Sequence, residues 1–295
     1  MRILVTGAGG YLGSACVGHL AGRHEVTAGG HSSPERPDAV IHMAFRFPKD
    51  NSARAELENQ TALRAMIDFC MARNVSRFIF PSTYAVYPCS ERTAVESDAL
   101  FPESEYARGK GTAERMLQES GLPHVILRLT HVYGRGTGVG DEGGVILQWL
   151  DRAMHGKDIE VIDGETIERD YIHLRDVLAA VEACLEREPA MGRVYNIGSG
   201  AGVTLLDLAR QIARIAGGET GRDVSVRNRR SATPVIWRRR VDLRRAEEEL
   251  GFYPRVNLVE GLKEMAAART TGLPDQRLRR PKCRRLRRRP EAAAR

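Results

Sequence analysis

The sequence predicts an α/β fold in which a doubly wound parallel sheet carries helices on both faces and is followed by a smaller α/β lobe. Two observations predict it. The chain opens as strand, glycine turn and helix, and short apolar runs then alternate with helical patterns through the first half. The second half is less regular. We therefore expect a sheet domain over residues 1–165, a lobe that shares elements with it over 166–270, and a tail over 271–295.

The opening stretch carries the first functional signal. An apolar strand at residues 2–6 runs into Gly7, Gly10 and Gly13, and residues 14–22 follow as a helix. Gly7 permits a sharp turn, Gly10 leaves room for an approaching pyrophosphate, and Gly13 lets the helix pack closely on the sheet. The helix N-terminus offers unpaired N–H groups and a positive dipole end to phosphates. This order predicts dinucleotide binding.

The other elements follow in sequence. Further strands of the sheet are expected at residues 25–28, 38–44, 77–80 and 124–129, with helices at 53–73, 103–120 and 144–155 and a glycine-rich loop over 134–144. The second half predicts strands at 159–161 and 193–196 and helices at 174–187, 204–216, 242–250 and 257–268. Only about ten residues separate the second strand from the third, enough for extended chain at roughly 3.3 Å per residue. We therefore expect one outer strand of the sheet to be missing.

The net charge of +7 belongs to the C-terminal tail. Residues 276–295 hold ten of the 45 Lys and Arg and one of the 38 Asp and Glu, so the rest carries 35 basic and 37 acidic groups. Such a basic block repels itself and is expected to be disordered. We interpret it as a solvated tail, with nucleic acid as the alternative partner.

Cysteine spacing and apolar run lengths bear on the compartment. The five cysteines at 16, 70, 89, 184 and 283 contain no CxxC pair and no metal spacing, which predicts buried thiols in a reducing cytoplasm and no metal site. The longest apolar runs are too short to span a membrane. Because the chain opens on a strand, we expect no signal peptide.

The candidate catalytic groups are a phenol and an ammonium four residues apart. Tyr106 and Lys110 share one face of the expected helix over 103–120. A nearby cation is expected to lower the pKa of the phenol from about 10 toward neutrality, so that it can exchange a proton while a hydride moves. Thr83 follows a strand, and its hydroxyl is expected in the crevice at the carboxyl ends of the strands.

At this point the chain resembles the extended short-chain dehydrogenases/reductases of the NAD-dependent epimerase/dehydratase type, which have a Rossmann fold and act on nucleotide sugars. The resemblance extends from residue 1 to about residue 264. It rests on residues 6–13, 40–44, 59, 80–87, 106 with 110, 127–134, 169–173, 195–198 and 250–254.

The resemblance implies a role for each matching residue. Thr83 would hold the sugar oxygen, Tyr106 would be the acid or base, and Lys110 would tune it and bind the nicotinamide ribose. The implied cofactor-binding residues are Gly7, Gly10, Tyr11, Leu12, Gly13, Met43, Ala44 and Lys110. The implied substrate-binding residues are Thr83, His131 (where the family usually has Asn), Arg169, and one of Arg227, Arg229 and Arg230, of which we select Arg230. The family likeness also implies a homodimer through the helices at 53–73 and 103–120.

Two departures from the family pattern narrow the reaction. Tyr84 and Ala85 stand where dehydratases carry an acidic pair, which disfavours dehydration and decarboxylation and leaves 4-keto reduction or 4-epimerisation. The second strand ends in Gly29, Gly30 and His31 without the acid that binds the ribose of NAD, which favours NADP over NAD.

We therefore expect an NADPH-dependent reductase of a nucleotide-linked 4-keto (deoxy)sugar. The alternatives are a nucleotide-sugar 4-epimerase with retained NAD, a non-catalytic nucleotide-binding protein with an RNA-binding tail, and a degenerate product whose short region after the second strand cripples cofactor binding.

Overall fold

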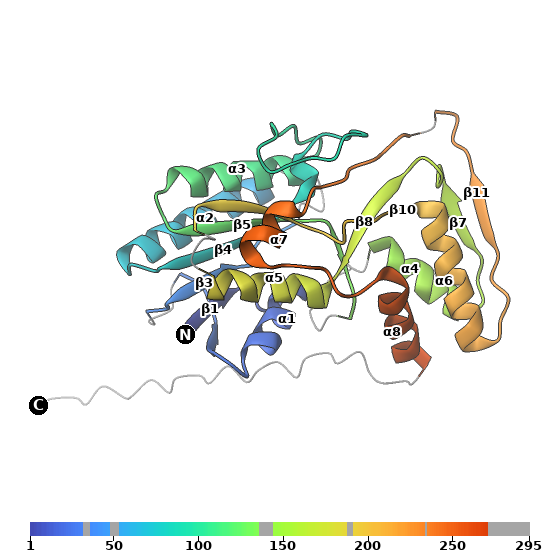
Figure 1. The fold of residues 1–295 in the computed structure, drawn as a ribbon, viewed down its shortest axis with the longest axis horizontal. Coiled ribbons are helices and arrows are strands. Elements are labelled where there is room, and N and C mark those ends of the chain that lie inside the picture. Colours follow the sequence, from blue (N-terminus) through green and yellow to red (C-terminus); the bar gives the residue numbers. More distant parts are fainter. Residues whose placement is uncertain (32–35, 48–52, 136–143, 188–190, 234, 271–295) are drawn as a thin grey trace, which may run out of the picture.

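The computed structural model describes residues 1–31, 36–47, 53–135, 144–187, 191–233 and 235–270. Within these ranges six parallel strands form the central sheet, in the order β2-β1-β3-β4-β5-β9 (Figure 1). Their bounds are β1 Arg2–Thr6, β2 Glu25–Ala28, β3 Ala39–His42, β4 Arg77–Thr83, β5 His124–Leu129 and β9 Arg193–Ile197. The four central strands are buried almost throughout, as expected of strands covered on both faces. The predicted doubly wound α/β fold is confirmed.

Helices cover both faces of this sheet (Figure 1). One face carries α1 Tyr11–Leu20, α5 Leu174–Glu186 and α7 Arg244–Leu250, and the other carries α2 Ala53–Ala72 and α3 Glu105–Glu119. Successive residues of a strand point to opposite faces, so Ile3 packs in the apolar cluster under α1 and α5 while Leu4 packs in the cluster under α2 and α3. The β-branched, apolar strands therefore supply two cores from one sheet.

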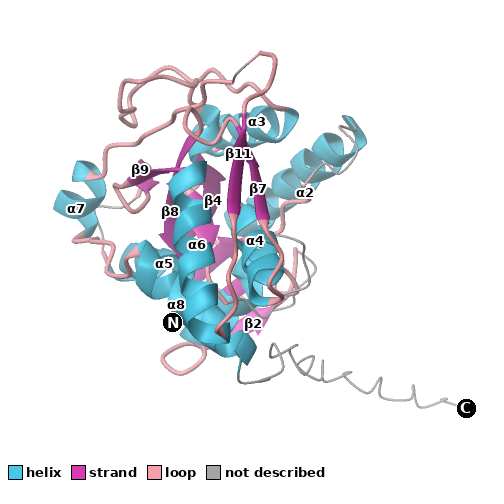
Figure 2. Cartoon of the chain, turned by 90° about the vertical axis from the view of Figure 1, so that its right-hand side faces the viewer, coloured by secondary structure: helices cyan, strands magenta, loops and turns pink. Residues whose placement is uncertain are grey.

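The second lobe lies beside the carboxyl ends of these strands. It contains the three-stranded sheet β10-β8-β6 and the parallel pair β7 and β11, which run side by side in Figure 2. The strand bounds are β6 His131–Tyr133, β7 Ile159–Ile162, β8 Glu168–His173, β10 Gly202–Thr204 and β11 Val226–Arg229. Helices α4 Gly144–Met154, α6 Leu205–Thr220 and α8 Leu258–Thr270 pack together here around buried apolar side chains such as Leu208 and Ile212.

The chain passes between the lobes several times. Thr130 alone separates β5 of the first sheet from β6 of the second. Side-chain packing groups α4 and β7, which precede residue 165, with the second lobe, and it groups α5, β9 and α7 with the first. The two lobes thus share the chain on both sides of residue 165, and the boundary drawn there stays a prediction.

Several predicted elements shift or are new. The first helix begins at Tyr11, with Gly10 as its N-cap, and ends at Leu20 instead of spanning 14–22. Strands β6, β8, β10 and β11 were not expected from the sequence, because they are only three to six residues long and, in β8 and β11, carry charged side chains. Most of the expected loop over 134–144 and the whole tail over 271–295 lie outside the described residues.

The expected loss of an outer strand is confirmed within the described residues. Strand β2 pairs with β1 and stands at the edge of the sheet. Its residues are half-buried or exposed, unlike those of the central strands. Within the described residues, no strand therefore pairs with the outer edge of β2.

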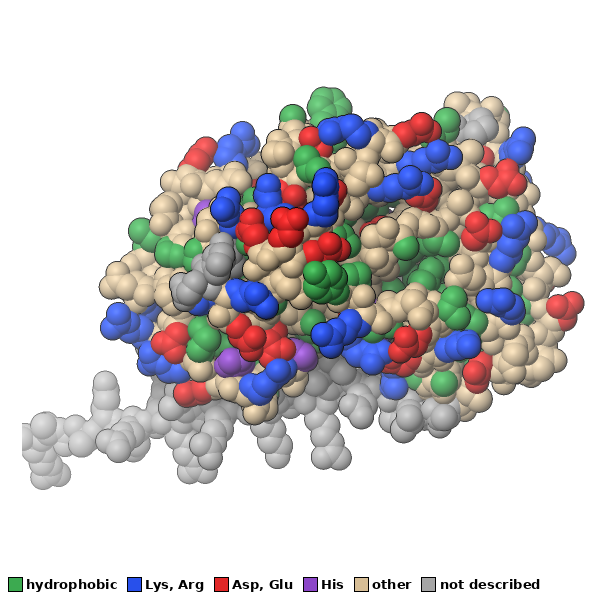
Figure 3. Space-filling view, viewed as in Figure 1, with side chains coloured by type: hydrophobic (Ala, Val, Ile, Leu, Met, Phe, Trp, Pro, Cys, Tyr) green, Lys and Arg blue, Asp and Glu red, His purple; other side chains and the backbone are tan. Residues whose placement is uncertain are grey.

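Charged side chains of both signs are interspersed over the face of the molecule shown in Figure 3. Many form ion pairs, which agrees with the near-neutral charge of the chain without its tail. Among the described residues no helix is long and apolar enough to cross a membrane. Within the same described ranges, no group of three or more His, Cys, Asp or Glu side chains is arranged so that it could hold a metal ion. Homodimerisation through α2 and α3 stays a prediction.

Candidate active site

The turn from β1 into α1 leaves no room for a side chain at Gly7 or at Gly13, which packs against it. Gly7 has a φ of +65°, and a Cβ there would lie 2.7 Å from the backbone of Met43 and Ala44 at the end of β3. A Cβ on Gly13 would overlap the carbonyl oxygen of Gly7, and one on Gly10 would lie 3.3 Å from the same oxygen. The loop thus presents bare backbone at the N-terminus of α1, as a bound diphosphate requires. These residues fit a dinucleotide.

A cavity of about 540 Å³ opens at the carboxyl ends of the strands, between the two lobes. Almost all of the site residues expected from the sequence line it: Gly7, Gly10, Tyr11, Leu12, Gly13, Met43, Thr83, Tyr106, Lys110, His131 and Arg169. Ala44 does not line the cavity. Its backbone N–H donates to Thr6 Oγ1 (3.2 Å) at the end of β1. Lining residues from Gly7 to Trp237, far apart in sequence, thus meet at one cavity.

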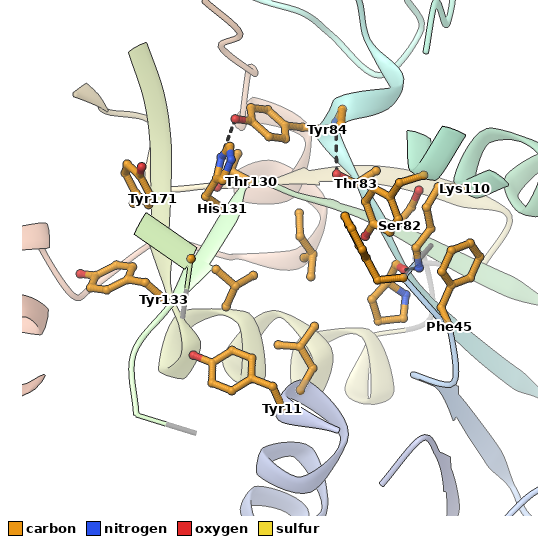
Figure 4. A pocket seen from close by; sticks show the side chains of 18 of the residues that line it. Tyr11, Phe45, Ser82, Thr83, Tyr84, Lys110, Thr130, His131, Tyr133 and Tyr171 are labelled. Atoms are coloured by element: carbon orange, nitrogen blue, oxygen red, sulfur yellow. Dashed lines mark hydrogen bonds between the residues drawn. The ribbon is translucent and has the colours of Figure 1, made fainter. Parts of the chain in front are cut away.

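Thr83 and Lys110 lie along one side of this cavity (Figure 4). Thr83 ends β4, and its Oγ1 accepts the backbone N–H of Ala85 (3.2 Å), which caps the short helix η1 Tyr84–Val86. Lys110 Nζ donates to the carbonyl oxygen of Pro81 (2.6 Å) and lies 4.0 Å from the ring centre of Phe45. The strand end and helix α3 therefore hold the hydroxyl and the ammonium at the same wall.

Tyr106 stands one turn before Lys110 on α3. Its ring lies edge-on to Phe45 (5.9 Å between ring centres) and 4.8 Å from the ring of Phe47. Phe45 therefore contacts both the phenol and the ammonium. Sequence reasoning missed Phe45 and Phe47, although both closely follow the predicted cofactor residues Met43 and Ala44.

The protonation states differ from the sequence-based expectation. Burial raises the pKa of Tyr106 to about 12, so the expected lowering by Lys110 does not occur in this structure. Burial lowers the pKa of Lys110 to about 7, against the opposing effect of the Glu114 carboxylate. The physical reason is desolvation, which disfavours the charged form of each group. Tyr106 is therefore a neutral phenol at physiological pH.

The opposite part of the cavity is aromatic and cationic. Tyr84 and His131 lie at its top in Figure 4, where the Tyr84 hydroxyl and His131 Nδ1 are 2.7 Å apart. The ring of Trp237 lies 6.0 Å from that of His131, and the guanidinium of Arg169 lies 5.3 Å from the Trp237 ring centre. Trp237 was missed by sequence reasoning, because no local motif connects it to the site.

The predicted substrate arginines end up in different places. Arg169 lines the cavity, and its Nε is buried without a hydrogen-bond partner among the described residues. Arg230 does not line it: its side chain is 78% exposed and pairs with Glu165 (3.1 Å). Arg227 and Arg229 likewise pair with acidic residues of or next to β7. Arg227, Arg229 and Arg230 thus each pair with an acidic residue in or near β7. Of the four predicted substrate arginines, only Arg169 lines the cavity.

A Rossmann-type sheet with a bare glycine loop, a Tyr–Lys helix and a strand-end threonine at one cavity defines a dinucleotide-dependent class of enzyme. The chain belongs to the NAD dependent epimerase/dehydratase family, whose model matches residues 31–198. The predicted family is thereby confirmed.

Among individual proteins, the chain is 29% identical over 235 residues to the dTDP-4-dehydro-6-deoxyglucose reductase of Escherichia coli, covering 77% of this chain and 73% of that protein. It is 28% identical over 325 residues to the UDP-glucose 4-epimerase of Azospirillum brasilense, covering 90% of each. In structure it is similar to a UDP-glucose 4-epimerase from Thermotoga maritima solved with UDP-glucose, at 25% identity and a TM-score of 0.79 over 92% of this chain and 100% of that one. All three are enzymes, which agrees with the prediction of an enzyme over a non-catalytic binding protein.

Proposed function

We propose that this chain reduces the 4-keto group of a nucleotide-linked sugar, with NADPH favoured over NADH as the reductant. The observation that carries the proposal is the common cavity of Thr83, Tyr106 and Lys110, in which the two residues after Thr83 are Tyr84 and Ala85 and supply no carboxylate. The similarity to a 4-keto sugar reductase supports the same substrate class.

In the proposed mechanism, Gly7, Gly10 and Gly13 would hold the diphosphate of a nicotinamide nucleotide, which would supply a hydride for the carbonyl carbon of the sugar. Tyr106 donates its phenolic proton to the carbonyl oxygen as negative charge develops there, and solvent later reprotonates the phenolate. Thr83 donates its hydroxyl hydrogen to the same oxygen, because its own Oγ1 already accepts from Ala85 N–H. Lys110 stabilises the transient phenolate. The product is the secondary alcohol.

The protonation state of Tyr106 supports reduction. A proton donor has to hold its proton at working pH, and burial raises the pKa of this phenol to about 12. An enzyme that starts by oxidising an alcohol needs the phenolate instead.

Elimination of water receives no support from the neighbouring groups. It requires an acid and a base in addition to Tyr106, and the two residues that follow Thr83 offer only the Tyr84 phenol, which is bonded to His131. Burial raises the pKa of Tyr84 and lowers that of His131 to about 3, so neither exchanges a proton readily at neutral pH.

The end of β2 supports NADPH. Gly29 and Gly30 follow the strand and present no carboxylate that would repel a 2′-phosphate. The open edge at β2 removes a wall from the adenosine side of the cofactor, which favours an exchanged over a retained nucleotide.

The alternative is a nucleotide-sugar 4-epimerase, favoured by the similarity over 90% of both chains to such an enzyme. The nucleotide content of the purified protein distinguishes a reductase from an epimerase. A reductase purifies without a full complement of nucleotide and oxidises one added NADPH per dTDP-4-dehydro-6-deoxyglucose consumed. An epimerase purifies with NAD(H) and interconverts UDP-glucose and its 4-epimer without addition.

Tyr106→Phe tests the assigned proton donor. We expect turnover to fall at least about 100-fold with nucleotide binding retained, because only the proton is removed. Full turnover by this variant would overturn the mechanism.

A further inference from the structure

A buried carboxylate lies behind the candidate active site. Glu114 stands one turn after Lys110 on α3 and is 1% exposed. Its Oε1 accepts the hydroxyl hydrogen of Ser82, the residue before Thr83. Its Oε2 accepts from Arg128 of β5, with Nη2 at 2.7 Å and Nε at 3.1 Å. One carboxylate thus connects the helix of Tyr106 and Lys110 with the two strands that end at the cavity.

Arg128 fixes this carboxylate from the far side. Its Nη1 donates to the hydroxyl of Tyr87 (2.6 Å), which donates in turn to Asn196 Oδ1 (2.8 Å) on β9. The Arg128 and Glu114 side chains are 4% and 1% exposed. A buried ion pair is weak evidence of stabilisation, because apolar residues of similar volume often serve as well or better. Packing alone therefore does not explain why a charged pair is buried at this position.

The surroundings of Lys110 offer an explanation for the buried charge of Glu114. The side chain is 5% exposed, and around its ammonium lie the faces of Phe45 and Phe80, at 4.0 and 4.4 Å, and the carbonyl oxygen of Pro81. These contacts solvate a cation only in part, and burial disfavours its charge. The charged and titratable groups coupled to this ammonium are His42 from β3 and Glu114 from α3. Tyr106 shares the Phe45 ring with it, Glu56 of α2 lies by the neighbouring Gly109, and Arg128 of β5 pairs with Glu114.

Glu114 stands four residues after Lys110 on the same face of α3, and its charge opposes the effect of burial on Lys110. His42 is neutral, because burial lowers its pKa to about 3. Tyr106 is a neutral phenol. The negative charge of Glu114 raises the pKa of Lys110 against burial, which lowers it to about 7.

We propose that Glu114, held by Arg128 and Ser82, is a positioning residue of this site whose carboxylate keeps Lys110 protonated beside Tyr106. The proposal deepens the proposed function, because a charged Lys110 is needed to stabilise the phenolate formed when Tyr106 donates its proton. It assigns Glu114 no contact with substrate or cofactor.

The charge of Lys110 can be read without any substrate. The chain has five lysines, at 49, 110, 157, 263 and 282, so the full-length protein labelled with ¹³Cε-lysine gives few NMR signals, and Lys110→Met assigns the one of interest. The ¹³Cε shift against pH reports the protonation of each lysine. We expect Lys110 to titrate near pH 7 in the native protein and about one pH unit lower in Glu114→Gln, because the neutral amide no longer stabilises the cation.

Two further variants separate charge from folding. Glu182→Gln removes a carboxylate that pairs with Arg23 between α5 and α1, away from the cavity, and is expected to leave the Lys110 titration unchanged. Glu114→Gln leaves Arg128 buried and unpaired, so the double variant Glu114→Gln/Arg128→Met serves if the single one does not fold. We expect the double variant to regain thermal stability but not the native Lys110 titration.

A native Lys110 titration in folded Glu114→Gln, or in the double variant, would overturn the proposal. The same shift is expected in the pH profile of NADPH-dependent turnover, whose alkaline limb moves to lower pH. Absence of any turnover in the native protein would instead refute the proposed function, while the NMR titration still decides the role of Glu114.

Discussion

The hydroxyl of Tyr84 lies 2.7 Å from Nδ1 of His131, and this hydrogen bond joins η1 of the first lobe to the first strand of the second. Burial lowers the pKa of His131 to about 3, with Arg169 and Arg239 adding to the effect, so the imidazole is neutral. A neutral imidazole beside a protonated phenol accepts the hydroxyl hydrogen at Nδ1 and carries its own proton on Nε2. The pair therefore gives the cavity wall a fixed hydrogen-bonding pattern.

Tyr84→Phe removes the hydroxyl that bonds His131 Nδ1. We expect little change in fold, because the aromatic ring remains. We expect the native protein to show His131 as a single Nε2–H tautomer in ¹⁵N NMR and the variant to show a mixture. If Nε2–H binds substrate, KM rises about two- to tenfold while kcat changes little. His131→Gln assigns the signals. A protonated His131 near pH 6 in the native protein would contradict the neutral assignment.

The glycine loop offers a matched pair of substitutions. Gly13→Ala introduces a Cβ that overlaps the Gly7 carbonyl oxygen and lies 2.7 Å from its carbon, whereas a Cβ on Gly9 meets nothing within 4 Å. We expect Gly13→Ala to weaken NADPH binding strongly and to lower the melting temperature. Gly9→Ala should match the native protein in both. Fluorescence titration with NADPH and thermal melting measure the two effects, and equal behaviour of the two variants would argue against this packing.

Lys110 is expected to make stability depend on pH. Its pKa is about 7 in the folded chain and about 10.4 when unfolded. Between these values the unfolded chain binds the extra proton, so the contribution of Lys110 to the free energy of unfolding rises with pH. The free energy of unfolding of the native protein minus that of Lys110→Met should therefore increase from pH 7 to pH 10.

Urea unfolding at several pH values tests this difference. Buried Cys16, Cys70 and Cys184, whose pKa values burial raises to about 12, act in the opposite direction at alkaline pH. They are present in both proteins and cancel in the subtraction. A difference that stays flat from pH 7 to pH 10 would show that Lys110 remains protonated in the folded chain.

Arg169 and Arg230 are expected to differ sharply as substrate ligands. Arg169 lines the cavity with an unpartnered Nε, while Arg230 is exposed and paired with Glu165. If the cavity takes a nucleotide sugar, Arg169→Met should raise its KM about 10- to 100-fold, the loss expected for a charge-assisted hydrogen bond. Arg230→Met should raise KM less than twofold. A large effect of Arg230→Met would mean that β11 moves toward the cavity when substrate binds.

The sequence predicted well what local pattern controls. The strand at 2–6 followed by Gly7, Gly10 and Gly13 predicted the glycine loop, because a Cβ at Gly7 or Gly13 would overlap backbone atoms and one at Gly10 would be tight. The alternating apolar runs predicted the sheet, since buried parallel strands need them. The four-residue spacing of Tyr106 and Lys110 predicted a shared helix face, and the short gap after β2 predicted the missing strand.

Tertiary structure decided what depends on residues distant in the chain. It brought Trp237 to the cavity and paired Arg230 with Glu165. It also reversed the expected acidity of Tyr106, because a pKa reflects desolvation by the whole fold as well as the nearest charge. Glu114 follows Lys110 at the same four-residue spacing in the sequence. Only the tertiary structure shows that its carboxylate is buried and bonded to Arg128 and Ser82. Periodicity and glycine placement are patterns of neighbouring residues and can be recognised in the sequence. Burial and charge pairing join residues distant in the chain, so they exist only once the chain has folded.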